Sequence, residues 1–462
     1  MQHFDLCVIG SGSGNSLVNS AFRDQLVAIV DGAPWFGGTC LNAGCIPSKM
    51  LSYPADLAES ARHASALGVD VGEVSVRWDD LRDRVFGRVD ASAAAAEAQR
   101  ERHEGVTVFR QQASFVGHKR LLIGEEEVIT ADQFVIAAGS RPWVPEWPGL
   151  DDPAVADRVH TSDDVMRLPA LPRSLVIVGG GSVAAEFAHV FAACGVAVTL
   201  LNRGSRLLRS ADDAIGERFT ELLSRRVTLR LGQTVASLEP THDGVIVGTV
   251  DADGVEYFFE GERVLVALGR TPNGDTLNLA ATGVELDDRG RVVVDACQRT
   301  TAAGIWALGD VSSPYQLKHV ANHEMRVVQH NLLHPGDLIE TDHRFVPSAV
   351  FSNPQVASVG ATEQELRAAG TPYVSALRDY ADVAYGWAMA DSGHFAKLLA
   401  DPETGLLLGA HILGPDAANL IQPLIQAMSF GLTAPEMARG QYWIHPALTE
   451  VVENALLDLR LS

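Results

Sequence analysis

Long apolar runs and positive charge are both scarce in this sequence. No uninterrupted apolar segment among its 462 residues approaches the roughly 18 that a membrane-spanning helix needs. There are 36 Lys and Arg residues against 58 Asp and Glu residues, which gives a formal net charge of −22. Nucleic acids and anionic lipid surfaces attract basic proteins, so this composition disfavours both as partners. We interpret the acidity as a contribution to solubility.

Cysteine is also scarce, with five residues in the chain. The N-terminal segment MQHFDLCVIGSGSG lacks the basic region of a secretory signal and carries Asp5, so we expect a cytoplasmic protein, in which structural disulfides are rare. Three cysteines lie in apolar segments and are expected to be inert: Cys7, Cys194 and Cys297. The other two stand five positions apart in GGTCLNAGCIPSKM, and such a close cytosolic pair is more often catalytic or metal-binding.

This pair, Cys40 and Cys45, could form a structural disulfide, part of a zinc site or a redox-active dithiol. An ideal helix would rise about 7.5 Å between them and turn by about 500°, so a disulfide requires a distorted helix start, which Gly44 and Pro47 make feasible. A bond across so short a loop constrains the unfolded chain little. Zinc needs about four ligands, and no second close Cys or His pair accompanies this one. The sequence therefore favours a redox-active dithiol.

A glycine-rich turn follows the first predicted strand. DLCVIG leads into GSGSGN, and a second strand, VAIVD, ends on Asp31. In such a β–turn–α–β unit Gly10 permits the tight turn, Gly12 lets a pyrophosphate approach, and the helix N-terminus meets its charge. Asp31 follows Gly12 by 19 residues, where an acid binds a ribose diol. The third glycine of the fingerprint is Asn15, with Gly14 beside it. The unit predicts a dinucleotide site.

The same pattern returns at residue 175, in LVIVGGGSVAAEFAHVFAACGVAVTLLNR. Its fingerprint positions are Gly179, Gly181 and Ala184. The second strand of this unit does not end in an acid: Arg203 follows Asn202, and the run RGSRLLR adds Arg206 and Arg209. A basic cluster at this position favours the 2′-phosphate of NADP over the ribose hydroxyl of NAD, although a solvated basic turn is the alternative.

Near the end of the chain, YWIHPALTE places Glu450 five residues after His445. A Glu bonded to one imidazole nitrogen would orient the ring, raise its basicity and leave the other nitrogen for a thiol. The alternative is an ordinary surface or core histidine, since the chain has 15. Beside two dinucleotide sites and a dithiol, the pair suggests an acid–base group for thiol chemistry.

Together these motifs resemble the pyridine nucleotide–disulfide oxidoreductases, the family of glutathione reductase and dihydrolipoamide dehydrogenase. The match runs in order through GSGSGN, GGTCLNAGCIPSK, AAGSRP, GGGSVAAEFA, ALGRTPN, ALGDVS and HPALTE. The resemblance implies an α/β fold with two Rossmann-like domains, for FAD and NADPH, and a C-terminal α+β dimerisation domain. The implied division is 1–145 and 266–340 for the FAD-binding domain, 146–265 for the NADPH-binding domain, and 341–462 for the interface of a homodimer.

The resemblance also implies a role for each motif residue. Cys45 would face the flavin and form a charge-transfer thiolate, and Cys40 would attack the substrate disulfide. Lys49 would lie near flavin N5 and pair with Glu186. His445 and Glu450 would come from the opposite subunit. The implied FAD contacts are Gly10, Gly12, Gly14, Asp31 at the adenosine ribose, Thr39, Lys49, Gly139 and Asp310 at the ribityl chain. The implied NADPH contacts are Gly179, Gly181, Ser182, Arg203, Arg209 and Gly269.

Four longer stretches are similar to an actinobacterial branch of the family that reduces mycothione, the disulfide of mycothiol. They are RVFGRVD, SSPYQLKHVANHEMRVVQHNLL, DVAYGWAM and MARGQYWIHPALTEVVENALL. A dihydrolipoamide dehydrogenase would carry an acid where this chain has Asn202 and Arg203, whereas a glutathione or trypanothione reductase would share NADPH use. A mercuric reductase would have a C-terminal cysteine pair in place of ALLDLRLS. A non-catalytic flavoprotein sensor and a structural zinc protein are the remaining alternatives.

Overall fold

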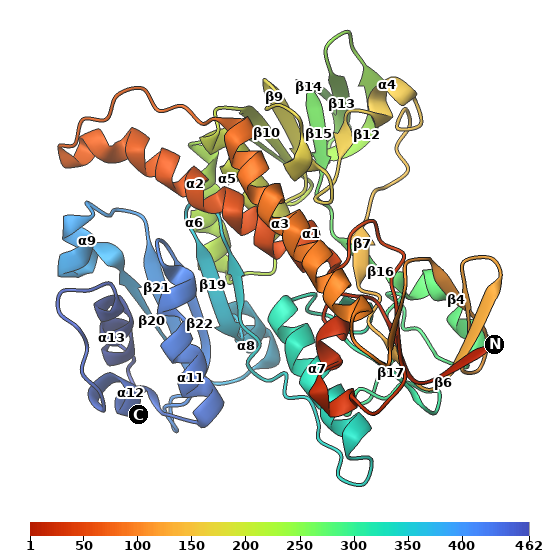
Figure 1. Ribbon diagram of the computed structural model, residues 1–462. Coiled ribbons are helices and arrows are strands. Elements are labelled where there is room, and N and C mark those ends of the chain that lie inside the picture. Colours follow the sequence, from red (N-terminus) through yellow and green to blue (C-terminus); the bar gives the residue numbers. More distant parts are fainter. Residues whose placement is uncertain (462) are drawn as a thin grey trace.

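A largely parallel sheet organises the N-terminal region of the computed structural model, which describes residues 1–461 (Figure 1). It has seven strands in the order β3-β2-β1-β6-β5-β4, and β17 pairs with β6. The strands are β1 (Gln2–Ile9), β2 (Val27–Val30), β3 (Val106–Phe109), β4 (Ala113–Gly117), β5 (Arg120–Ile123), β6 (Glu127–Ile136) and β17 (Ile305–Ala307). Because β1, β2, β6 and β17 run parallel, their carboxyl ends meet at one edge, where open α/β sheets bind ligands.

The connection from β1 to β2 differs from the sequence expectation. The predicted α-helix is wrong, because two short 3-10 segments replace it, η1 (Gly14–Leu17) and η2 (Ser20–Phe22). The segment is rich in Asn and Ser, whose side chains compete with helical hydrogen bonds. The Asn19 side chain accepts a hydrogen bond from Ala21 N at 2.9 Å, and Arg100 donates to both the side chain and the carbonyl of Asn15.

A second parallel sheet follows, in the order β11-β10-β9-β15-β8. Its strands are β8 (Val159–His160), β9 (Ser174–Val178), β10 (Ala197–Asn202), β11 (Thr228–Leu231) and β15 (Arg263–Val266). Crossover helices α5 (Ser182–Ala193) and α6 (Asp213–Ser224) connect β9 to β10 and β10 to β11. An antiparallel meander of β12 (Thr234–Pro240), β13 (Val245–Val250) and β14 (Glu256–Gly261) covers it, with α4 (Pro153–Ala156) beside β12. The two Rossmann-like regions that the sequence predicted are confirmed.

Helices from the first region extend across the second (Figure 1). α1 (Gly38–Asn42) is followed after two residues by α2 (Cys45–His63), and α2 packs on both α3 (Trp78–Glu101) and α5. Leu51 and Ala55 of α2 share one hydrophobic cluster with Ala184 and Ala188 of α5. The segment 64–77 contains a Gly-Val-Asp-Val-Gly sequence and only one 3-10 turn, and it separates α2 from α3. α2 therefore ties the two dinucleotide-binding regions together.

A short two-stranded ribbon joins two segments of similar sequence. β7 (Ser140–Pro142), in AAGSRP, pairs antiparallel with β16 (Arg270–Pro272), in ALGRTP. In sequence, β7 follows β6 of the first parallel sheet, and β16 follows β15 of the second. The chain therefore leaves and re-enters the first region at adjacent points, which brings residues near 140, 270 and 310 together.

The C-terminal region is α+β, as predicted, and lies beside α7 (Lys318–Leu333) (Figure 1). Its antiparallel sheet has the order β18-β19-β22-β21-β20. The strands are β18 (Ser348–Val350), β19 (Val356–Gly360), β20 (Val374–Asp379), β21 (Phe395–Ala400) and β22 (Leu407–Leu413). The helices are α8 (Glu363–Ala369), α9 (Ala384–Ala388), α10 (Ala417–Leu420), α11 (Gln422–Phe430), α12 (Ala434–Arg439) and α13 (Thr449–Leu457). Through residue 461, none of the helices has the length and apolar content needed to cross a membrane.

Candidate functional site

The cysteine pair lies across a break between two helices. Cys40 belongs to α1 and Cys45 is the first residue of α2, with an irregular backbone at Ala43 and Gly44. The predicted distortion of the helix start is therefore confirmed. Both cysteines are free thiols in this structure. The break replaces the wide angular separation of an ideal helix with a geometry in which the two thiols contact each other.

The two thiols differ in acidity. A hydrogen bond from the Cys40 thiol lowers the pKa of Cys45 to about 7, burial opposes this shift, and the Cys45 backbone amide and Lys49 support it. The same hydrogen bond, together with burial, raises the pKa of Cys40. In the reduced protein Cys45 is therefore the first of the two thiols to ionise as the pH rises. Since the thiolate is the nucleophilic form of cysteine, the pair is chemically asymmetric.

Lys49 and Glu186 form an ion pair between α2 and α5. Lys49 Nζ lies 2.5 Å from Glu186 Oε2 and 4.7 Å from the centre of the Phe351 ring. The other carboxylate oxygen of Glu186 accepts a hydrogen bond from Phe351 N at 2.9 Å. The structure thus brings together the two residues that the resemblance paired, one helical turn beyond Cys45, and holds them from three segments of the chain.

The first glycine turn is tightly packed against the end of β6. Gly10 has φ +109°, and a Cβ there would lie 2.2 Å from the Ala137 carbonyl oxygen. A Cβ on Gly14 would lie 2.6 Å from Ala137 Cβ. Gly14, and not Asn15, therefore fills the position of the fingerprint at which close packing requires a glycine. Gly38, at the start of α1, approaches Gly12 so closely that a Cβ on Gly38 would lie 2.6 Å from its Cα. The turn therefore lies next to the helix that carries Thr39 and Cys40.

Asp31 ends β2 beside this turn. Its carboxylate accepts hydrogen bonds from Ser11 N at 2.8 Å and from Ala33 N at 2.7 Å, one on each oxygen. Arg110 donates to the Asp31 carbonyl at 2.8 Å. A carboxylate oxygen can accept a second hydrogen bond, so the buried group is oriented and still able to bind a ribose hydroxyl.

Asp310 lies where the two-stranded ribbon meets the first sheet. Ser140 Oγ donates to Asp310 Oδ2 at 2.7 Å, and Arg270 Nε donates to Ser140 Oγ at 2.8 Å. The neighbouring Gly309 N donates to the buried Glu324 at 2.7 Å. Gly139, beside Ser140, has φ +68° and no atom within 4 Å of a Cβ position. Asp310 is thus fixed next to exposed backbone at the carboxyl edge of the sheet.

The second glycine turn repeats the first. Gly179 has φ +141°, and its Cβ would lie 2.2 Å from the Ala267 carbonyl oxygen. Cβ atoms on Gly181 and Gly269 would meet no protein atom within 4 Å, so their backbone faces open space. Ser182 is the exposed first residue of α5. Tight glycines, open glycines and a helix start at the carboxyl end of a parallel strand fit the pyrophosphate of a dinucleotide at this turn.

The basic loop after β10 contains three arginines, one of which is paired with an acidic residue of the same chain. Arg206 lies 2.6 Å from Asp213 Oδ1, and its backbone carbonyl accepts a hydrogen bond from the Asn202 side chain at 2.8 Å. Arg203 and Arg209 are exposed, and within residues 1–461 neither side chain has an acidic partner. Of the three arginines in the predicted basic cluster, Arg203 and Arg209 therefore remain candidates for the phosphate contacts that the resemblance implies.

His445 and Glu450 are paired but are not near the dithiol of the same chain. Glu450 Oε1 lies 2.7 Å from His445 Nδ1, and the imidazole side chain is 72% exposed. His445 lies in the segment between α12 and α13, and Glu450 is the second residue of α13; both helices are at the side of the C-terminal region away from α1 (Figure 1). The expected tie between the two side chains is therefore present, whereas a single chain does not bring this histidine to Cys40.

Sequence reasoning missed several polar residues around these groups. Lys318, the first residue of α7, donates to Ser13 Oγ at 2.8 Å, and its charge lowers the pKa of Cys40 against the stronger opposing effects. Arg270 and Asn202 belong to motifs in which the glycines and charges carry the sequence signal. Their roles in holding Ser140 and the basic loop become visible only when distant segments are placed side by side.

The inert assignment of the remaining cysteines agrees with their surroundings. Burial raises the pKa of Cys7, and it raises the pKa of Cys194 to about 11. Cys297 is buried and its pKa is raised mainly by burial. A thiol with a raised pKa carries little thiolate at neutral pH, so these three have none of the reactivity of Cys45.

Comparison with known proteins defines the class. The pyridine nucleotide-disulphide oxidoreductase family matches residues 4–326, and the dimerisation domain of that family matches residues 346–456. The chain therefore belongs to the pyridine nucleotide-disulphide oxidoreductases, and it is an FAD-dependent oxidoreductase that uses a reduced nicotinamide dinucleotide and a disulfide.

Individual relatives match over their full length. The mycothione reductase of Mycobacterium tuberculosis is 51% identical, with 100% of both chains covered. The dihydrolipoyl dehydrogenase of Halobacterium salinarum is 35% identical, over 98% of this chain and 95% of the relative. Among solved structures, the HOCl-induced flavoprotein disulfide reductase RclA of Escherichia coli, as a Cu(II) complex, superposes with a TM-score of 0.87 at 27% identity, covering 99% of each chain.

Proposed function

We propose that this protein reduces mycothione to mycothiol with NADPH, through FAD and the Cys40–Cys45 pair. The single observation that carries the substrate is the 51% identity to a mycothione reductase over all of both chains, well above the 35% to a dihydrolipoyl dehydrogenase. The asymmetric dithiol and the two dinucleotide turns support the reaction class. The product would maintain a pool of reduced thiol in the cell.

In this proposal the residues around the dithiol divide the chemistry. Bound FAD supplies the relay that passes two electrons from the nicotinamide to the Cys40–Cys45 disulfide. Cys45, with its low pKa and with Lys49 nearby, holds the thiolate, while Cys40 gives its proton to His445 and attacks one substrate sulfur. His445 returns this proton to the first thiol that leaves. The Cys45 thiolate then attacks the sulfur of Cys40 in the mixed disulfide, which restores the enzyme disulfide and releases the second product as a thiolate that takes its proton from solvent.

The proposal needs a second copy of the chain. His445 is exposed and distant from Cys40 in its own subunit, and the chain carries the dimerisation domain of the family. We assign 341–462 to this interface, 1–145 and 266–340 to the FAD-binding domain, and 146–265 to the NADPH-binding domain. In a homodimer each active site would then combine Cys40 of one subunit with His445 and Glu450 of the other.

NADPH is the proposed reductant because of the basic loop. Arg203 and Arg209 are exposed and free of acidic partners in the described part of the chain, and they follow a strand that ends in Asn202 instead of an acid. Two guanidinium groups can bind the 2′-phosphate with charge-assisted hydrogen bonds. A dihydrolipoyl dehydrogenase or a glutathione reductase-like enzyme is the alternative, favoured only by the weaker identities to such relatives.

The decisive experiment compares three disulfides at equal concentration. Purified yellow protein is mixed with NADPH or NADH and with mycothione, oxidised glutathione or lipoamide, and nicotinamide oxidation is followed. We expect fast turnover only with mycothione and NADPH. A Cys40→Ser variant should lose disulfide reduction yet still accept electrons from NADPH on the flavin. Preference for lipoamide or glutathione would overturn the substrate, and full turnover by Cys40→Ser would overturn the mechanism.

A further inference from the structure

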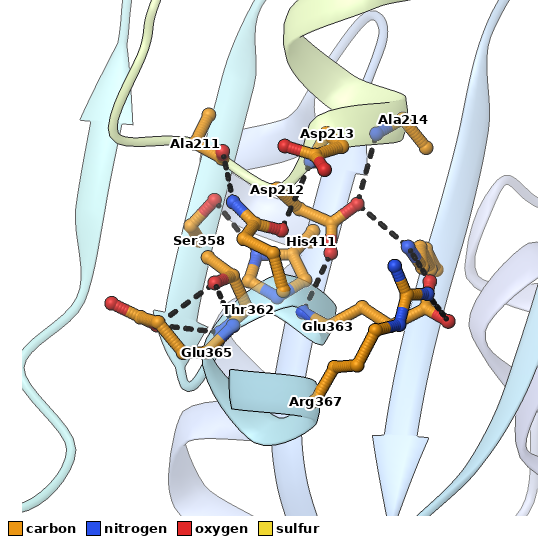
Figure 2. Close-up of polar contacts among 12 residues, drawn as sticks. Ala211, Asp212, Asp213, Ala214, Ser358, Thr362, Glu363, Glu365, Arg367 and His411 are labelled. Carbon is orange, nitrogen blue, oxygen red and sulfur yellow. Dashed lines mark hydrogen bonds and ion pairs between the residues drawn. The ribbon is translucent and has the colours of Figure 1, made fainter. Parts of the chain in front are cut away.

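A buried ionic cluster lies where the second dinucleotide-binding region meets the C-terminal region (Figure 2). Lys397 of β21 has its Nζ 2.7 Å from Asp212 Oδ1 and 2.6 Å from Glu363 Oε2. Lys397 and Asp212 are buried, and so is the neighbouring His411. A buried lysine between two carboxylates costs desolvation energy, so its geometry must be well determined. We call Lys397, Asp212 and Glu363 the Lys397 cluster.

The Lys397 cluster joins the starts of two helices. Asp212 caps α6 by accepting from Ala214 N at 3.1 Å, and its other oxygen accepts from Glu363 N, in the first turn of α8, at 2.9 Å. Gln364 of α8 donates to the Ala211 carbonyl at 2.9 Å and accepts from Asp213 N at 3.2 Å. Figure 2 shows these contacts around the start of α6. The segment just before α6 is thus bonded to the C-terminal region at both backbone and side-chain atoms.

That segment is the end of the basic loop. The loop starts at Asn202, whose side chain donates to the Arg206 carbonyl, and Leu208 N donates to the Gly180 carbonyl at 2.7 Å. It ends at Ala211 and Asp212, in the Lys397 cluster. The exposed Arg203 lies between Asn202 and Leu208, and the exposed Arg209 lies between Leu208 and Ala211. One anchor of the loop belongs to the glycine turn and the other depends on residues some 185 positions away in sequence.

We propose that Lys397 is a positioning residue for coenzyme selection, which holds through Asp212 the loop that presents Arg203 and Arg209 to the 2′-phosphate of NADPH. The inference rests on the proposed use of NADPH. NADH has no phosphate at this position, so its binding does not depend on where the two arginines lie. A substitution at Lys397, in the C-terminal region, should therefore alter the preference between NADPH and NADH, although this residue contacts neither coenzyme.

The test uses holoenzyme and two probes that differ by one phosphate, adenosine 2′,5′-bisphosphate and 5′-AMP. Lys397→Met removes the central charge. Gln364→Ala removes the neutral ties to Ala211 and Asp213 and leaves no buried charge unpaired, so it remains informative if Lys397→Met folds poorly. Asp401→Ala is the matched control, because Asp401 caps the turn at the other end of the same β21–β22 hairpin, by accepting from Glu403 N and Thr404 N.

We expect Lys397→Met to weaken bisphosphate binding about tenfold, and Gln364→Ala to weaken it by a smaller factor, with 5′-AMP binding unchanged within about twofold. KM for NADPH should rise in parallel while KM for NADH stays constant, and Asp401→Ala should change neither. Equal weakening of both probes, or no change in either, would overturn the role of Lys397. A wild-type protein that binds both probes equally would instead overturn the proposed NADPH use.

Discussion

The two glycine turns use the same backbone geometry and differ at the end of the strand that follows. Gly10 and Gly179 both have positive φ, and at both a Cβ would lie 2.2 Å from a carbonyl oxygen of the neighbouring strand end. At the first turn Asp31 accepts two backbone hydrogen bonds, whereas at the second Asn202 donates to two carbonyls of a basic loop. The backbone of each turn is therefore suited to a pyrophosphate, and we propose that the strand-end side chains account for a difference in the ribose chemistry that each turn accepts.

The crossovers after the two turns also differ. The second turn continues into α5, a 12-residue helix whose Glu186 reaches Lys49 beside the dithiol. The first continues into 3-10 segments that depend on Arg100 of α3 for support. If the second turn binds the nicotinamide dinucleotide and the first binds FAD, as we propose, α5 connects the nicotinamide side to the dithiol, and the close approach of Gly12 and Gly38 connects the flavin side.

The largest expected effect comes from adding one methyl group to each turn. Gly10→Ala and Gly179→Ala would each place a Cβ against a carbonyl oxygen, a strain of about 2–3 kcal/mol or more. We expect Gly10→Ala to bind FAD about 30- to 150-fold more weakly. Gly179→Ala should stay yellow but lose NADPH oxidation. The ratio of flavin to protein absorbance after gel filtration measures the first effect, and steady-state kinetics measure the second. If both variants lost FAD equally, the two turns would not serve separate ligands.

The parts that sequence could predict are those that depend on local geometry. Gly10 and Gly179 are required by the turns themselves, because both have positive φ and a Cβ at either would lie against a carbonyl oxygen. The break before Cys45 follows from Gly44 and the nearby proline. The α-helix that the motif predicted after Gly14 is absent from the structure, and this error shows a limit of the same reasoning. The motif implies a helix, but Asn19 accepts a local hydrogen bond from Ala21 N instead, and the distant Arg100 donates to the Asn15 carbonyl.

Other features depend on segments that are far apart in sequence. The spacing of residues in the sequence does not show that Arg206 pairs with Asp213, or that Arg203 has no acidic partner within residues 1–461. It also does not show that Lys397 contacts the end of the loop at Asp212. The separation of His445 from Cys40 likewise appears only in three dimensions. The domain boundaries at 145, 265 and 340 stay predictions.

Exchanging the strand-end residues would test the difference between the turns directly. Asp31→Asn would turn an amide group toward one of the two backbone N–H donors, Ser11 N or Ala33 N. Asn202→Asp would place a carboxylate against the carbonyls of Gly204 and Arg206. Each leaves a polar group unpaired, which costs about 1–3 kcal/mol. We expect Asp31→Asn to speed FAD loss and Asn202→Asp to weaken NADPH binding, each without the other effect, as measured by flavin release and by KM.

A smaller effect is expected from reversing one charge in the basic loop. Arg203→Glu would repel the 2′-phosphate, so KM for NADPH should rise about tenfold while KM for NADH changes little. Arg206→Gln is the informative companion, because Arg206 binds Asp213 and should act only through the loop. Steady-state kinetics with both coenzymes give the answer. Equal changes in the two KM values would mean that Arg203 does not contact the phosphate.

The smallest expected effect is a shift in the pKa of Cys45, near which Glu186 of α5 pairs with Lys49. The pKa of Cys45 is lowered to about 7, so in the reduced enzyme its thiolate is present above that pH and is lost as the pH falls through it. Because Lys49 favours the thiolate, Lys49→Met should move this midpoint to higher pH. Alkylation of reduced enzyme across a pH series, followed by peptide mapping, reports Cys45 separately from Cys40. Lys318→Met is the control, since Lys318 acts on Cys40, and the Cys45 midpoint should not move. An unchanged Cys45 midpoint in Lys49→Met would show that the ion pair with Glu186 cancels the charge of the lysine, and that α5 contributes geometry to the dithiol but no electrostatic assistance.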